Sequence, residues 1–448
     1  MVGFEVGLTL VREVLRALLT PLRLLGYLPW RHYWRRAARE VLDAAAHTAP
    51  ETAETALREF FQKRRAPRAE RPHLFVSAGE TSGEAHASRL VQALARSVRC
   101  TAFGGHQLEQ AGATLRCALS EHAVMGFTGV LRQLPLLLRA FASYLRLLRD
   151  DPPDLVVLVD YPGLHVVMAK AAKRRKIPVI HYVAPQYWAW GPWRMRRYRR
   201  AVDATLTILP FETAFFRRFR IPAAYIGHPL LDELEAHPPD AAAVAGVRRQ
   251  PTLVLLPGSR RAEIETNLPG MLRIARQLRD GDPSCRVVLP HKDGRRTGLL
   301  RAMLAQADAA FVEHHEGPLA PWLAGAHLIL AKSGTGSLEA CLHGNPTIVV
   351  YQLRGLVSTL GYHNILSVPW IAAANLVAGR AVVPEFCFHH PGGWDDVLAA
   401  ARALWLSGPE RDATRQGLAE VRQRLGASGA TARVAAIVGA FLLPEARA

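Results

Sequence analysis

The sequence has few cysteines, and nothing in their arrangement indicates a crosslink or a metal. Five cysteines are scattered over 448 residues, and none form a CxxC pair. Neither a disulfide framework nor a zinc site is indicated, which suits a reducing cytosol. Eighteen histidines are present, but they include no HExxH pattern, and the adjacent His389 and His390 cannot share one helix face. The sequence predicts neither a metal site nor a cofactor.

Acidic residues are also scarce. The chain has 38 Asp and Glu against 56 Lys and Arg, a net charge of +18. This balance predicts attraction to phosphates, nucleic acid or an anionic membrane surface, and it says nothing of the fold. The cations gather in runs within residues 170–176, 194–200 and 217–220. Solvated helix faces are the alternative explanation of these runs.

No apolar run at the N-terminus is long enough to span a membrane. Apolar residues recur at helical spacing over residues 4–28, but charged residues interrupt them too often: Glu5, Arg12, Glu13, Arg16 and Arg23. Aromatic residues interleaved with arginines follow over residues 29–36. This pattern fits a helix lying in a membrane interface, and it fits equally a helix docked on the protein's own core. Glu5 and Glu13 make an organellar presequence a weaker reading, and a secretory signal is not indicated.

Beyond residue 72, strand-like and helical patterns alternate. The strand-like runs are 74–77, 155–160, 179–183, 204–209 and 224–226, and then 253–256, 286–289, 328–331 and 347–351. Helical patterns lie between several of them, as at 84–97 and 163–173. Such alternation predicts an α/β protein with parallel sheets that bind ligands at the C-terminal strand ends. The Ala- and Pro-rich stretch 235–249 separates the two series. We therefore predict Rossmann-like domains over 73–245 and 246–448, facing across a cleft, after a helical extension and linker over 1–72.

Two loops in the second series have the composition of phosphate-binding turns. One is Leu-Pro-Gly-Ser-Arg at 256–260 and the other Lys-Ser-Gly-Thr-Gly-Ser-Leu-Glu at 332–339. The residues that would hold an anion are Gly258, Ser259, Arg260, Ser333, Gly334, Thr335, Gly336 and Ser337. Small residues at a helix start expose backbone N–H groups, and an arginine adds a bidentate cation. Glu339, one helical turn past Thr335, could accept from a ribose hydroxyl. Two tight turns without a ligand are the alternative.

In the first series, Asp160 ends the apolar strand 155–159. A carboxylate there is a candidate general base, or else an N-cap for the next helix. The turn at 78–84 is a weaker phosphate-binding signal. The aromatic run 181–190 is either core or a stacking and acyl-chain surface, and the apolar, arginine-dotted stretch 124–148 is either a core helix or an interfacial one.

Nine segments together resemble the lipid-A-disaccharide synthase family in order and rough spacing, from about residue 73 to 440. They are 79–83, 124–126, 160–162, 188–190, 210–212, 227–229, 256–260, 333–339, and 375–376 with 383–385. The resemblance implies a GT-B fold with the donor nucleotide on the C-terminal domain and the acceptor toward the N-terminal one. It implies metal-free, inverting transfer from UDP-2,3-diacylglucosamine to 2,3-diacylglucosamine 1-phosphate, giving the β-1,6 disaccharide and UDP.

The resemblance also assigns roles to individual residues. It implies that Asp160 is the catalytic base. It also implies that Arg260 and the 333–337 loop bind the diphosphate and that Glu339 binds the ribose. It adds Asn375 to the donor site and puts Glu80, Ser82, Gly83 and Arg194 on the acceptor side. Most departures from the family pattern fall in the N-terminal half. They include Gly163, Leu164 and His165, where the family has Asp-Phe-Asn.

The resemblance implies a UDP-activated acylated sugar, a lipid monosaccharide acceptor and an anionic membrane surface as partners, without nucleic acid. It implies a cytoplasmic protein, peripheral on the inner face of the inner membrane. A GT-B enzyme with another acceptor, a UDP-sugar 2-epimerase, and a basic membrane or nucleic-acid binder with a vestigial site are the alternatives. The last is disfavoured because Asp160, Arg260 and Glu339 are all retained.

Overall fold

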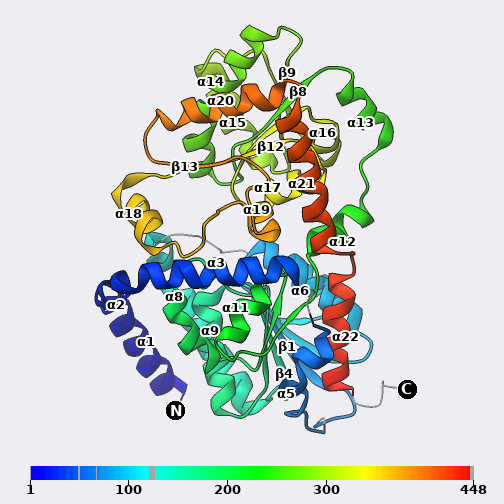
Figure 1. Ribbon diagram of the computed structural model, residues 1–448. Coiled ribbons are helices and arrows are strands. Elements are labelled where there is room, and N and C mark those ends of the chain that lie inside the picture. Colours follow the sequence, from blue (N-terminus) through cyan, green and yellow to red (C-terminus); the bar gives the residue numbers. More distant parts are fainter. Residues whose placement is uncertain (1, 49–50, 67, 121–126, 444–448) are drawn as a thin grey trace. The chain divides into compact units, whose positions relative to one another are not determined.

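The computed structural model describes residues 2–48, 51–66, 68–120 and 127–443 (Figure 1). Within this part of the chain there are two compact units. The first contains residues 1–41, 47–232 and 427–448, and the second contains residues 42–46 and 233–426. Each is built on one parallel sheet flanked by helices, as the alternating pattern predicts. The prediction of two Rossmann-like α/β domains is confirmed.

The sheet of the first unit has seven parallel strands in the order β3-β2-β1-β4-β5-β6-β7. Their bounds are β1 His73–Ala78, β2 Arg99–Phe103, β3 Thr114–Cys117, β4 Leu155–Val159, β5 Val179–Tyr182, β6 Ala204–Thr207 and β7 Ala223–Tyr225. Every residue of β1 and β4 is buried. This is the state expected of central parallel strands covered by helices on both faces, and it explains their continuous apolar sequence.

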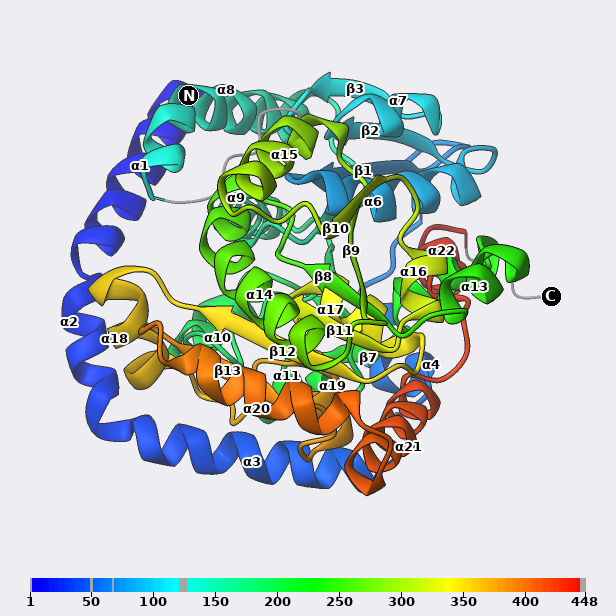
Figure 2. The same cartoon turned by 90° about the horizontal axis from the view of Figure 1, so that it is seen from above.

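The helices of the first unit include three at the N-terminus: α1 Val2–Leu18, α2 Thr20–Tyr27 and α3 Arg31–His47. The others are α4 Ala53–Ala56, α5 Arg58–Phe61, α6 Thr81–Leu94, α7 His106–Gln110, α8 Phe127–Asp150, α9 Pro162–Arg174, α10 Met195–Arg199, α11 Glu212–Arg218, α12 Pro229–Ala236 and α22 Ala430–Leu442. The chain leaves this unit within α12. Short 3₁₀ turns cover Leu28–Trp30 and Pro192–Arg194. Figure 2 shows α1 running beside α8.

The sheet of the second unit has six parallel strands in the order β10-β9-β8-β11-β12-β13. They are β8 Thr252–Leu256, β9 Arg286–His291, β10 Val312–Glu316, β11 Leu328–Lys332, β12 Thr347–Gln352 and β13 Glu385–Phe388. The helices are α13 Ala241–Arg248, α14 Arg261–Gly281, α15 Thr297–Gln306, α16 Ala320–Gly325, α17 Thr335–Leu342, α18 Gly355–Ile365, α19 Ala373–Ala378, α20 Gly393–Trp405 and α21 Pro409–Leu425, with a 3₁₀ turn at Gly294–Arg296.

Alternate residues of β8 supply two separate cores in the second unit. Leu253 and Leu255 pack with apolar residues of α14 and α20, whereas Val254 packs with residues of α16 and α17 on the other face. Figure 2 shows α14 and α20 together over one side of this sheet. Because successive strand side chains point to opposite faces, helices cover both sides and leave the strand ends for ligands.

The compact units divide the chain at different residues from the predicted domains. The predicted second domain is 246–448, but α22 belongs to the first unit. Its apolar residues Val434, Val438 and Phe441 are buried in that unit's core, and Phe441 stacks on Phe60 with ring centroids 4.4 Å apart. The same core takes in Leu57 and Phe60, so this part of the predicted extension 1–72 packs with the first unit. Burial of these apolar faces sets the division.

By length and composition, one helical stretch among the described residues could cross a membrane, Pro409–Leu442. It comprises α21 and α22. The apolar side chains of α22, the second helix of this stretch, lie in the core of the first unit.

Candidate active site

Asp160 follows β4 in a strained turn. Asp160 and Tyr161 have φ angles of 52° and 48°, a left-handed conformation that is uncommon for residues other than glycine. Such strain persists only where surrounding contacts enforce it, and it concentrates at functional sites. Burial raises the pKa of the Asp160 carboxyl, while a hydrogen bond from the Tyr161 backbone partly opposes the shift. A carboxylate with a raised pKa is a better proton acceptor than an ordinary aspartate.

Two buried histidines hold the main chain of Asp160. His165 Nδ1 and His181 Nε2 both donate to the Asp160 carbonyl, at 2.7 and 2.8 Å. The carbonyl only accepts, so the other ring nitrogen of His165 accepts from the Ser77 hydroxyl at 2.9 Å. Burial lowers the pKa of His165 to about 3 and that of His181 to about 4. The two rings are therefore neutral supports that fix the strained turn.

The start of α6 lies beside Asp160. A Cβ built on Gly83 would lie 3.8 Å from the Asp160 Cβ, and a Cβ on Gly79 would overlap the Tyr161 ring at 2.2 Å. Glycine at position 79 lets the turn after β1 approach the turn after β4, whereas a Cβ at position 83 would make ordinary contacts. Glu80 is the N-cap residue of α6. The structure thus brings Gly83 of the predicted acceptor side next to the candidate base.

The remaining acceptor-side residues lie at the surface. Ser82 is exposed in the first turn of α6. Arg194 is exposed too, and its guanidinium lies 5.8 Å from the Tyr187 ring centroid. It lines a groove that also takes in Pro162 and Gly163, the first two residues of α9. Arg194 and the start of α9 therefore line one groove.

Other motif residues of the first unit are structural. Trp188 is buried and donates from Nε1 to the Glu212 carboxylate at 3.1 Å. Glu212 also accepts from the backbone of Ile208 and Leu209 at 3.1 and 3.0 Å. Burial raises the pKa of Glu212 to about 7 despite these bonds. Of the aromatic run 181–190, Trp188 is thus core, whereas Trp190 is partly exposed. The Val-Met-Gly segment 124–126 lies outside the described residues.

In the second unit, Glu263 joins the two glycine-rich loops. Its carboxylate accepts from the backbone N–H groups of Ser259 and Arg260 at 3.2 and 3.3 Å. It also pairs with Arg260 Nη1 at 3.0 Å and with Lys332 Nζ at 2.9 Å. Gly258 has a φ of +121°, and a Cβ there would meet Glu263 at 2.6 Å. The loop after β8 therefore already holds an anionic group, at the N-terminus of α14.

The loop after β11 is open and polar. Gly334 has a φ of +152°, and its N–H donates to the Ser337 hydroxyl at 3.2 Å, which fixes the start of α17. Ser333 Oγ donates to the Ile371 carbonyl at 3.1 Å. Thr335 is exposed, and nothing would lie within 4 Å of a Cβ on Gly336. This first turn of α17 has space for an anion.

Glu339 and Asn375 have different surroundings. The carboxylate of Glu339 is partly buried and pairs with Nζ of the exposed Lys292 at 3.1 Å. Asn375 is fully buried, and its side-chain amide is hydrogen-bonded to neighbouring residues. Its Nδ2 donates to Val383 O and Glu385, both at 3.0 Å, and its Oδ1 accepts from the backbone of residues 382 and 383. Asn375 thus shapes the segment that leads to β13.

The predicted site residues leave out four residues that shape these sites: His165, His181, Glu263 and Lys332. Lys332 was visible as a charge at the end of an apolar strand, the same signal that singles out Asp160. The other three act through contacts between elements distant in sequence. Among the described residues, no group of three or more His, Cys, Asp or Glu is placed to hold a metal ion.

In the N-terminal helices α1 and α2, the apolar side faces outward and the acidic side chains face the protein. No residue of α1 is buried. Glu5 pairs with Arg174 and Arg175 at 2.8 Å, and Glu13 pairs with Arg197 at 2.7 Å, so the acidic residues point toward the protein. Apolar side chains point outward and are 40–79% exposed: Phe4, Leu8, Val11, Val14, Leu15, Leu18, Leu19, Leu22 and Leu25. An exposed apolar stripe of this length marks an interaction surface.

Comparison with known proteins identifies the family. The family model described as Lipid-A-disaccharide synthetase matches residues 74–424. The chain belongs to the lipid-A-disaccharide synthase family. The lipid-A-disaccharide synthase of Myxococcus xanthus is 36% identical over 384 residues, covering 83% of this chain and 98% of that protein. The one of Geobacter metallireducens is 33% identical over 390 residues, covering 82% and 96%.

Solved structures support the fold of this family member. The glycotransferase of kitacinnamycin has a TM-score of 0.53 at 17% identity, covering 84% of this chain and 100% of that one. The UDP-GlcNAc 2-epimerase of Neisseria meningitidis has a TM-score of 0.52 at 14% identity, covering 82% and 99%. These likenesses show a GT-B architecture shared by transferases and epimerases. The lipid-A-disaccharide synthase match begins at residue 74, so α1, α2 and α3 lie outside it.

Proposed function

We propose that the protein transfers the 2,3-diacylglucosaminyl group of its UDP derivative to 2,3-diacylglucosamine 1-phosphate. The products are the β-1,6-linked disaccharide 1-phosphate and UDP. The observation that carries the proposal is membership of the lipid-A-disaccharide synthase family together with a half-buried carboxylate, Asp160, at the end of β4. The two-unit α/β fold agrees with it.

In this proposal Asp160 is the general base. Its carboxylate takes the proton of the acceptor 6-hydroxyl as that oxygen attacks the anomeric carbon of the donor. The bond from the anomeric carbon to the diphosphate breaks, UDP leaves with the electron pair, and the configuration inverts. Burial keeps the carboxylate weakly solvated, and the bonds from His165 and His181 keep its main chain fixed.

The leaving diphosphate needs cations and N–H donors. We assign this role to the second unit, through Gly258, Ser259, Arg260 and the loop 333–337. The carboxylate of Glu263 supports the assignment because it occupies an anion position on the first loop. Glu339 binds the ribose, with Lys292 beside it. Asn375 contributes by holding the segment around Glu385 rather than by touching the nucleotide.

We propose that the protein works as a peripheral protein on the cytoplasmic face of the inner membrane. The outward apolar face of α1 and α2 and the arginines beside it support this location. Both proposed substrates carry acyl chains and reside in that membrane.

Product analysis tests the proposal. Purified protein is incubated in neutral detergent with UDP-2,3-diacylglucosamine, with and without 2,3-diacylglucosamine 1-phosphate, and UDP and lipids are measured by mass. The proposal predicts equal amounts of UDP and disaccharide 1-phosphate, formed only when both lipids are present. Release of UDP with a free 2-epimerised sugar and no disaccharide would refute it.

A further inference from the structure

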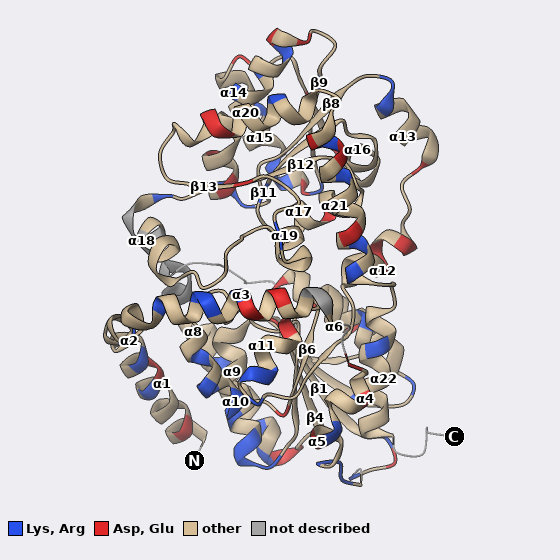
Figure 3. Cartoon of the chain, viewed as in Figure 1, with Lys and Arg blue, Asp and Glu red and all other residues tan. Residues whose placement is uncertain are grey.

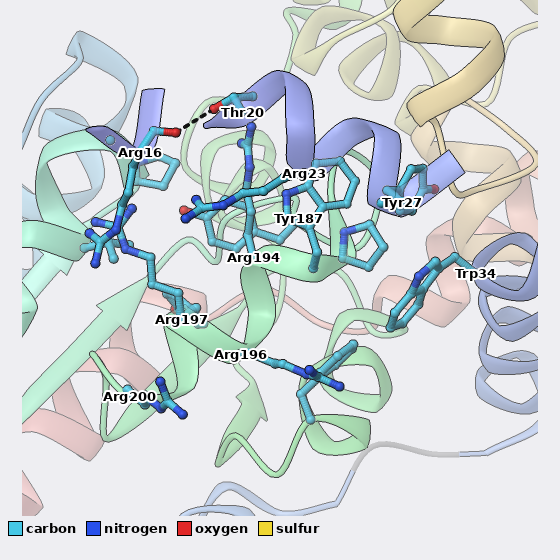
Figure 4. A pocket seen from close by; sticks show the side chains of 18 of the residues that line it. Arg16, Thr20, Arg23, Tyr27, Trp34, Tyr187, Arg194, Arg196, Arg197 and Arg200 are labelled. Atoms are coloured by element: carbon cyan, nitrogen blue, oxygen red, sulfur yellow. Dashed lines mark hydrogen bonds between the residues drawn. The ribbon is translucent and has the colours of Figure 1, made fainter. Parts of the chain in front are cut away.

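A groove in the first unit contains more positive charge than its own residues neutralise. It has a volume of about 1200 Å³ and lies between α1 and α2 on one side and α9 and α10 on the other (Figure 4). Seven of its lining residues are Lys or Arg, and only Glu13 is acidic. Glu13 already pairs with Arg16 and Arg197. We call this space the cationic groove.

Three arginines of the cationic groove are available to a ligand. Arg23, Arg196 and Arg200 are exposed, and none pairs with a carboxylate within the described part of the chain. Lys170, half-buried on α9, also lines the groove. Burial, together with the nearby Arg197 and Arg16, lowers the pKa of Lys170 to about 8. Figure 3 shows how Lys and Arg gather over α9 and α10.

Aromatic contacts hold the walls of the groove together. Tyr27 of α2 packs on Trp193 with ring centroids 4.5 Å apart, and Trp34 of α3 stacks on Phe219 at 5.8 Å. Arg194 lies over the same Trp193 ring at 5.9 Å. These contacts and the Glu13–Arg197 pair fix the N-terminal helices to the 3₁₀ turn 192–194, to α10 and to the residue that follows α11. The backbone segments that carry the cations are therefore held in place before any ligand arrives, which lowers the entropic cost of binding.

The lining of the groove includes residues close in sequence to the candidate base. Pro162 and Gly163 line the groove at the N-terminus of α9, and a Cβ on Gly163 would meet open space. Pro162 is two positions after Asp160 in the sequence, so their Cα atoms are at most roughly 7 Å apart. The thirteen-residue helix α9 has its partly positive N-terminus at this part of the groove.

The other side of the groove borders the apolar face of the N-terminal helices. Trp30 and Tyr33 line it and are 63% and 50% exposed. Amphipathic rings of this kind settle at the boundary between acyl chains and headgroups. The groove thus suits an amphiphile with an anionic head.

We propose that the cationic groove binds the phosphate of the lipid acceptor, which orients the acceptor hydroxyl toward Asp160. The inference rests on the proposed function for the identity of the acceptor. A phosphomonoester carries up to two negative charges and three acceptor oxygens, matching the unpaired arginines. A bulk phosphodiester lipid such as phosphatidylglycerol has only one such charge.

The test compares two acceptors that differ only in the phosphate. Binding of 2,3-diacylglucosamine 1-phosphate and of 2,3-diacylglucosamine, in neutral micelles, is followed by tryptophan fluorescence, and kcat/KM is measured for each. The double variant Arg23→Ala/Arg196→Ala removes two groove cations. Arg58→Ala/Arg96→Ala is the control, since it removes the same charge from exposed positions of the first unit that do not line the groove. Arg196→Lys tests partial rescue.

The wild type and the control should prefer the phosphorylated lipid. In the double variant this preference, in binding and in kcat/KM, should fall about 10-fold or more per arginine, the scale of a charge-assisted hydrogen bond. Equal losses on both lipids, or none, would overturn the proposal. So would equal competition by phosphatidylglycerol, which would make bulk lipid the occupant. Phosphate-selective binding without any transfer would instead refute the proposed function and leave the phosphate site standing.

Discussion

Glu5 of α1 and Arg175, just past α9, form an ion pair at 2.8 Å, and this contact turns the apolar side of α1 away from the protein. The hydrogen bond from Arg175 lowers the pKa of the Glu5 carboxyl, so the pair is charged at neutral pH. A helix docked on its own core would have the opposite orientation, with its apolar side buried. The arrangement favours the membrane-interface reading of residues 4–28.

The outward face should carry membrane binding. Leu15→Glu/Leu22→Glu puts two charges on side chains that are 52% and 63% exposed, without touching the Glu5 or Glu13 pairs. Sedimentation with vesicles containing anionic lipid should weaken at least ~10-fold, because burying a leucine contributes about 1.5–3 kcal/mol. Leu406→Glu, at a 67% exposed leucine of the second unit, is the control. Unchanged sedimentation of the double variant would contradict the account.

Arg260 should contribute to nucleotide affinity. Its guanidinium is half exposed and reaches Glu263 at the loop after β8. Arg260→Ala should weaken UDP binding about 10-fold or more, since a charge-assisted bond contributes about 1.5–3 kcal/mol. Arg261→Ala is a matched control, because Arg261 pairs with Glu265 instead. Calorimetric titration with UDP measures both. Equal affinities for the two variants would reject Arg260 as a diphosphate ligand.

The acid limb of the pH–activity profile should lie at a higher pH than an ordinary aspartate would give. Asp160 acts as a base only when ionised, and burial raises the pKa of its carboxyl. Activity should therefore rise with pH through a pKa above the ~3.9 of an ordinary aspartate. The pH profile of kcat/KM, taken where circular dichroism shows the fold intact, measures it. An acid limb at or below the ordinary value would argue that another group is the base.

The fold itself should lose stability in mild acid. Burial lowers the pKa of His165 to about 3 and that of His181 and His228 to about 4. The unfolded chain binds these protons near pH 6.5 and the folded chain does not. The free energy of unfolding should therefore fall as pH drops from about 6.5 toward 4. Denaturant titrations at pH 7 and pH 5 check this, and equal stabilities would contradict the neutral, buried state of these rings.

The central strands other than β2 were predictable from sequence, as was the edge strand β7, but the edge strands β3, β10 and β13 were not. Runs such as 155–159 and 253–256 are continuously apolar because helices cover both faces of the sheet. β10 reads Val-Glu-His-His-Glu at a sheet edge, and β3 and β13 are four-residue edge strands. β2 lies inside the sheet but is short and begins with Arg99. None of them has a long apolar run, and the alternation in β2 and β3 covers only four residues, so the prediction omitted them.

The candidate site, like the fold, was predictable from sequence only in part. A carboxylate after an apolar strand singled out Asp160, and loop composition singled out Arg260. The hydrogen bond from His181 to the Asp160 carbonyl depends on the left-handed backbone at residues 160 and 161. No local sequence pattern predicts that conformation. The pairing of Glu263 with Lys332 requires that β8 and β11 be neighbours. Such contacts follow from topology rather than from spacing along the chain.

The most direct test of the central claim is acceptor-dependent UDP release in the wild type and in Asp160→Asn. The substitution keeps the shape of the side chain and the main-chain bonds to His165 and His181, but it removes the base. The account predicts that UDP binding is retained and that acceptor-dependent turnover falls by ~10² or more, the usual scale for loss of a general base. A folded Asp160→Asn protein with near-normal turnover would contradict it.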